Sequence, residues 1–138
     1  MTLKTDPDTA AGLNSQQGTV FGTRLRQLRI QHGMTLAVLA RQLGVTAAYL
    51  SQLETGKRGK ASAVLVDQIC GCLGLIWDEA EALKTLAGLS DTRVVVDSAA
   101  LGPQATRAAN LFAMLLPRLD DEDARKMADW LENRSRQE

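Results

Sequence analysis

The chain has 138 residues, of which 45% are hydrophobic, 23% charged and 4% aromatic, and its net charge is zero. That apolar fraction supports a hydrophobic core and excludes a globally disordered chain, and the many Ala, Leu, Gln and Arg residues favour helices. No apolar run reaches the ~18 residues that a membrane span needs, and the start lacks the apolar region of a signal peptide. We therefore expect a cytoplasmic protein that makes no membrane contact.

The neutral total conceals a segregation of charge along the chain. Between Thr19 and Lys60 the only acid is Glu54, whereas from Ala61 to Thr92 five acids accompany the single Lys84. A local positive field attracts phosphate groups whatever the total charge, so the first of these segments is compatible with a nucleic-acid ligand. The alternative is a solvated helix face that is merely basic. The basic residues of that segment are Arg24, Arg26, Arg29, Arg41, Lys57, Arg58 and Lys60.

Residues 1–18 are polar and predict a flexible N-terminal arm. Residues 19–88 predict one domain of five short helices, because apolar residues such as Phe21, Leu25 and Leu28 recur at helical spacing. Glycines and capping residues divide these helices. The expected helix ends are Gly33, Gly44, Gly56, Gly74 and Gly88, and the expected starts after the first helix are Thr35, Thr46, Ser62 and Asp78.

Residues 89–102 interrupt the helical pattern. Arg93–Val96 is a short β-branched run that cannot form a sheet alone, so it is either a linker or one edge of a strand pairing with a second subunit. Residues 103–138 predict a helical hairpin, in which Pro103 lies in the first turn of one helix, Pro117 ends it and Asp120 caps the next.

This hairpin carries more apolar surface than two short helices can hide between themselves. Its apolar residues either pack on the first domain or form a dimer interface, and we favour a dimer because closed twofold assemblies are common. The residues concerned are Leu111, Phe112, Leu115, Leu116, Leu119, Met127, Trp130 and Leu131.

A helix-turn-helix is the motif that these patterns suggest. Two short helices joined at Gly44-Val45-Thr46 can cross steeply, and the small Ala40 permits their close approach. Over about residues 20–75 the sequence resembles the Cro/C1-type (XRE, phage-repressor-like) helix-turn-helix family. The matching residues are Leu25-Arg26-x-Leu28-Arg29, Gly33-Met34-Thr35, Leu39-Ala40, Leu43-Gly44-Val45-Thr46, Tyr49-Leu50-Ser51, Leu53-Glu54-x-Gly56, Ser62 and Ile69-Cys70-x-Cys72-Leu73-Gly74.

The resemblance implies an all-α fold, with a five-helix lambda-repressor-like DNA-binding domain followed by the C-terminal dimerisation hairpin. It also implies a recognition helix at about residues 46–54 that enters the major groove. Gln52 is best suited to a directional contact, since its amide can pair with adenine N6 and N7. The alanines there either touch thymine methyl groups or simply fill the helix surface. The base-reading positions are Ala47, Ala48, Ser51 and Gln52.

Other residues take supporting roles by the same resemblance. Arg29 and Glu54 match a structural ion pair that joins the first helix to the recognition helix. Phosphate contacts fix the register of the protein on DNA without reading its sequence. The residues expected to make them are Thr35, Thr46, Thr55, Lys57, Arg58 and Lys60.

The function expected is that of a homodimeric repressor on a pseudo-palindromic operator. The alternative is an antitoxin that represses its own operon and binds a toxin through the C-terminal helices; an anti-repressor is another such protein partner. An enzyme is not expected, because the single His32 lies at a helix end and no nucleophile–base pair or phosphate-binding loop is recognisable. Cys70 and Cys72 lack companion ligands, so no metal or cofactor is expected.

Overall fold

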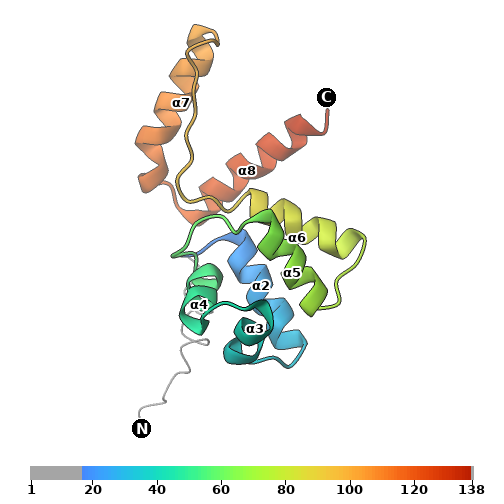
Figure 1. Cartoon of the computed structure of the whole chain (residues 1–138). Coiled ribbons are helices and arrows are strands. Elements are labelled where there is room, and N and C mark those ends of the chain that lie inside the picture. Colours follow the sequence, from blue (N-terminus) through green and yellow to red (C-terminus); the bar gives the residue numbers. More distant parts are fainter. Residues whose placement is uncertain (1–16, 138) are drawn as a thin grey trace. The chain divides into compact units, whose positions relative to one another are not determined.

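The computed structural model describes residues 17–137, and all regular secondary structure within them is helical (Figure 1). The expected all-α fold class is confirmed. The expected N-terminal arm lies almost wholly outside the described residues. The chain divides into two compact units, the first ending at Val94 and the second beginning at Val95.

The first unit contains the five expected helices. Their starts are set by local capping, because the side-chain oxygens of Thr35, Thr46 and Ser62 each accept a hydrogen bond from the backbone N–H three residues later, at 3.2, 3.0 and 3.1 Å. Gly44 and Gly56 end the second and third helices in the left-handed conformation, with φ of 71° and 78°. The helices are α2 (Val20–Gln31), α3 (Leu36–Leu43), α4 (Ala47–Thr55), α5 (Ala63–Cys72) and α6 (Asp78–Gly88).

One apolar core holds these five helices together. Helix α4 packs against both α2 and α3, and α6 packs against α2 and α5. Ala40 on α3 is 2% exposed, which fits the expectation that a small side chain stands where the two short helices cross. Other side chains at the centre of this core, all at most 2% exposed, are Phe21, Leu25, Leu39, Leu50, Leu53, Ile69 and Leu83.

The first unit continues past Gly88, where the sequence analysis ended the domain. Ser90 is buried, and its hydroxyl accepts a hydrogen bond from the Phe21 N–H at 3.0 Å and donates one to the Leu86 carbonyl at 2.7 Å. These two bonds attach the chain that leaves α6 to the start of α2. Ser90, which the sequence analysis assigned to the linker, is therefore packed against the five helices.

The second unit contains α7 (Pro103–Leu115), a 3₁₀ turn η1 (Leu116–Arg118) and α8 (Asp121–Ser135). Pro103 occupies the first turn of α7, and the Asp120 carboxylate caps α8 by accepting from the Asp123 N–H at 2.8 Å. No residue of α7 or α8 is buried. Among the described residues, 93–96 form no strand.

Gly22 marks a close approach of α2 to α4 that the sequence analysis missed. A Cβ atom on Gly22 would overlap the carbonyl oxygen of Leu53 and would lie 2.6 Å from that of Glu54. Both obstacles are backbone atoms, which cannot rotate away as a side chain can. Glycine is therefore required here because α4 approaches too closely for any side chain.

We expect Gly22→Ala to lower the free energy of unfolding by about 1–3 kcal/mol, because the added methyl group forces α2 and α4 apart. Gly71→Ala is the matched control: Gly71 also lies in a helix, and no atom stands within 4 Å of a Cβ built on it. That control should be neutral or stabilising by up to about 1 kcal/mol. Urea denaturation measures both variants, and equal effects would contradict the proposed close approach.

Candidate nucleic-acid interface

The turn between α3 and α4 fixes the direction in which α4 leaves. Gly44 takes the left-handed conformation, and the Val45 N–H donates to the Ala40 carbonyl at 3.0 Å. Val45, the residue after Gly44, is half-buried and packs against the core. Thr46 then caps α4, so the helix begins at a position set by both backbone and side-chain contacts. The two helices lie side by side across this short turn (Figure 1).

Helix α4 has one buried and one accessible face. Leu50 and Leu53 are buried and anchor it to the core. The four residues expected to read bases share the other face, because positions one turn apart lie on the same side of a helix. Ala47 and Ala48 are exposed, and Ser51 and Gln52 are partly exposed. The structure therefore brings the expected reading residues together on an accessible surface.

A buried ion pair joins α2 to α4. Arg29 Nε lies 2.7 Å from Glu54 Oε2, and Arg29 Nη2 lies 2.9 Å from Glu54 Oε1, which makes the contact bidentate. The two side chains are only 2% and 3% exposed. Arg29 Nη1 also donates to the Met34 carbonyl at 3.0 Å, so the same guanidinium holds the loop between α2 and α3. Three segments of the helix-turn-helix thus meet at one side chain.

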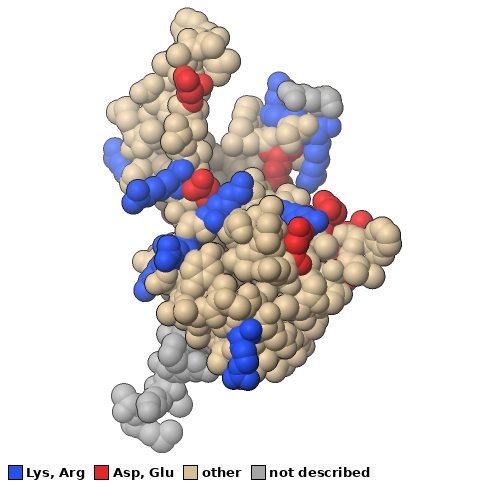
Figure 2. Space-filling model, viewed as in Figure 1, with Lys and Arg blue, Asp and Glu red and all other residues tan. Residues whose placement is uncertain are grey.

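This pair has a consequence for the surface charge. Glu54 is the only acid from Thr19 to Lys60, and it is neutralised inside the core by Arg29. The other six basic residues of that segment therefore have no acid of the same segment beside them. Figure 2 shows Lys and Arg side chains beside α4, and Asp and Glu side chains together with a Lys or Arg over α6. Phosphate groups would meet a positive field on the α4 side.

The threonines expected to contact phosphates differ in how their hydroxyls are used. The hydroxyl oxygens of Thr35 and Thr46 accept from backbone N–H groups, so each keeps its hydrogen to donate outward from the start of α3 or α4. The Thr55 hydroxyl instead donates to the Ser51 carbonyl at 2.9 Å, within its own helix. Lys57 and Lys60 are exposed in the loop that follows α4.

Arg58 is exposed, but its side chain contacts two residues of α4. Its Nε donates to Gln52 Oε1 at 3.0 Å, and its backbone N–H donates to the Gln52 carbonyl at 3.1 Å. Its guanidinium carbon lies 5.3 Å from the centre of the Tyr49 ring, a cation–π distance. The sequence indicates basic residues after Gly56, but it gives no sign of which one folds back onto Gln52.

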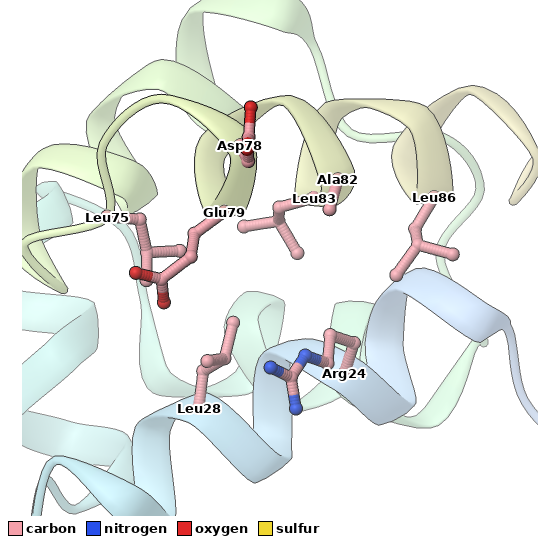
Figure 3. Close-up of a pocket in the computed structure, with 8 residues that line it drawn as sticks. All are labelled: Arg24, Leu28, Leu75, Asp78, Glu79, Ala82, Leu83 and Leu86. Atoms are coloured by element: carbon pink, nitrogen blue, oxygen red, sulfur yellow. The ribbon is translucent and has the colours of Figure 1, made fainter.

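A cavity of about 250 Å³ lies between α2 and α6, with no lining from α3 or α4 (Figure 3). Leucines line it from both sides, and the polar groups of Arg24 and Glu79 approach it from opposite helices. The cavity is thus separate from the α4 surface. Its lining residues are Arg24, Leu28, Leu75, Asp78, Glu79, Ala82, Leu83 and Leu86.

The remaining chemically reactive groups are held within the fold. His32 caps α2, and its Nδ1 lies 2.8 Å from the Leu28 carbonyl. Burial raises the pKa of the Cys70 thiol, which keeps it protonated. No three His, Cys, Asp or Glu side chains of residues 17–137 are grouped as a metal would need. Within the same residues no helix has the length and apolarity to cross a membrane.

Comparison with known proteins assigns the first unit to a family. A family model described as a helix-turn-helix domain matches residues 20–93, which is more than half of the chain. The protein therefore belongs to the helix-turn-helix family, as the resemblance in its sequence predicted. It is accordingly a DNA-binding protein of the transcription-regulator class.

One similar solved structure is a complex of the SinR and SinI proteins, with a TM-score of 0.41 and 19% identity, covering 84% of this chain and 98% of that one. No curated protein matches the chain.

Removing one partner of the buried ion pair should destabilise the protein strongly. We expect Glu54→Ala to cost about 3–5 kcal/mol, because the charge of Arg29 would stay in the core without the carboxylate of Glu54. The double variant Arg29→Met, Glu54→Leu should cost less than the single one, since no buried charge remains. Denaturant unfolding of the native protein, Glu54→Ala and the double variant measures these free energies. A double variant less stable than Glu54→Ala would refute the prediction.

Proposed function

We propose that the protein is a homodimeric repressor that binds a pseudo-palindromic operator, with α4 as the helix that enters the major groove. The observation that carries this proposal is the accessible face of α4, held in place by a buried ion pair and surrounded by basic residues. A helix that reads bases must be held in a fixed position, since its side chains must meet base edges at hydrogen-bond distances.

On the surface around α4, we propose that some residues contact bases and others contact phosphates. Ala47, Ala48, Ser51 and Gln52 would face the bases. Thr35 and Thr46 would donate their remaining hydroxyl hydrogens to phosphates at the positive ends of two helices. Exposed Lys57 and Lys60 would add sequence-independent attraction, with Thr55 and Arg58 beside them.

We propose that the second unit mediates dimerisation, because its apolar side chains are exposed to solvent. Seven of the eight residues named from the sequence are 38–62% exposed, and Leu119 is half-buried. A second copy would cover this surface and bring two α4 helices to successive half-sites about one helical turn apart. One module alone buries too little surface for tight, specific binding.

The same surface would serve a different protein partner if the chain is an antitoxin or is held by an anti-repressor. In that case a second polypeptide should co-purify with the native protein at a fixed stoichiometry. We propose no catalytic activity and no cofactor for either function, and we place both in the cytoplasm.

DNA binding can be tested by selecting bound duplexes from a random pool with the full chain. We expect an inverted repeat. Gln52→Ala should then relax the preference at one base pair per half-site by about 1–3 kcal/mol. Lys57→Ala should weaken all duplexes alike and reduce the salt slope by about one, because one phosphate contact is lost. If no duplex is enriched over competitor at moderate salt, the proposed function fails.

Dimerisation can be tested by measuring mass in solution. We expect a dimer for the native chain and monomer for Leu115→Asp at the same concentration, because a charge in an apolar interface should raise the dimer Kd on the order of 100-fold. Val64→Asp is the control, since Val64 is an exposed valine on α5, outside the second unit. A Leu115→Asp protein that stays dimeric would remove the second unit from the interface.

A further inference from the structure

The Gln52 amide is already engaged within the protein. Arg58 Nε donates to Gln52 Oε1 at 3.0 Å. Adenine recognition by glutamine requires that same oxygen to accept from adenine N6, while the amide nitrogen donates to N7. With Arg58 in place, a positive charge already stands at the oxygen and would oppose the approach of a second donor such as N6–H.

The groups that remain available are donors. Gln52 keeps both hydrogens of its Nε2, and the two Nη groups of Arg58 donate no hydrogen bond to protein among the described residues. Guanine presents two acceptors, N7 and O6, on its major-groove edge, whereas adenine presents one acceptor and one donor. A pair of donor groups that carries a positive charge therefore matches guanine better than adenine.

The pair is also fixed in position before any DNA is bound. The Arg58 guanidinium stacks at 5.3 Å on Tyr49, which belongs to α4 itself. Its backbone N–H is bonded to the Gln52 carbonyl at 3.1 Å, so the loop after Gly56 is attached to the end of the helix. Preorganised donors lose less freedom on binding than mobile ones.

We propose that Gln52 and Arg58 together recognise the guanine of one G·C base pair in each half-site, and that Arg58 determines this preference. The inference rests on the proposed function, because it assigns a base to the recognition helix already described. It replaces adenine, which the isolated side chain of Gln52 would favour, with guanine. It also moves Arg58 from the phosphate-contacting residues to those that determine specificity.

The test uses the full chain and the duplex that it selects from a random pool. Each base pair of one half-site is replaced in turn, and affinity is measured for the native protein and for Gln52→Ala, Arg58→Lys and Lys57→Met. Arg58→Lys keeps the charge but loses the planar donor pair, so it separates base recognition from phosphate attraction. Lys57→Met is the matched control, because it removes an exposed charge next to Arg58. Thermal unfolding of each variant verifies that it is folded.

We expect one G·C pair whose replacement by A·T weakens native binding about ten-fold or more. Gln52→Ala and Arg58→Lys should both lose that discrimination at the same position, while Lys57→Met keeps it and only binds more weakly. An A·T preference at the position sensitive to Gln52 overturns the inference but leaves the proposed function intact. If Arg58→Lys still distinguishes G·C from A·T as well as the native protein does, the inference is likewise overturned and the proposed function stands. If no duplex is preferred at all, the proposed function itself is refuted.

Discussion

The helix-turn-helix depends on the buried contact between Arg29 and Glu54. A charge is tolerated in a core only when it is paired, and displacing α4 would separate the Glu54 carboxylate from the Arg29 guanidinium. Gly22 adds a steric condition at the same place, because it lets the carbonyl groups of Leu53 and Glu54 approach α2. We infer that the ion pair and the glycine together define one position for the C-terminal end of α4, while Leu50 and Thr46 hold the rest.

Burying this pair also determines which charges the surface shows. A carboxylate at Glu54 that faced solvent would lie one turn from Ser51 on the accessible face of α4 and would repel phosphates. Inside the core it serves packing instead, and the exposed charge from Thr19 to Lys60 is uniformly positive. The acids that keep the chain neutral lie partly in the first turn of α6, where they suit the positive end of that helix. Burying Glu54 against Arg29 therefore both stabilises the fold and leaves the surface positive.

What the sequence predicted well is what depends on neighbours along the chain. Thr35, Thr46, Ser62 and Asp120 cap helices through bonds to residues three positions later, so the signal is complete within one turn. The Gly22 contact, the hydrogen bonds of Ser90 and the fold-back of Arg58 join residues that are separated in the chain or depend on the path of a loop. Helical periodicity places Gln52 on the outer face, but it says nothing of which side chain lies beside its amide.

In the second unit the helices begin where the local sequence predicts, but their apolar side chains are not buried. Pro103 and Asp120 begin their helices as expected, and the Thr106 hydroxyl donates to Ser98 Oγ at 2.9 Å, which attaches the preceding segment to α7. Short helices gain most of their stability from burying an apolar face, yet neither α7 nor α8 has a buried residue. Exposed apolar side chains on two successive helices are suited to an interaction with another polypeptide. A second copy bound there would make the second half-site contact intramolecular, which raises affinity without any new contact to DNA. On this view the first unit supplies recognition, and the second supplies the affinity that one recognition helix lacks.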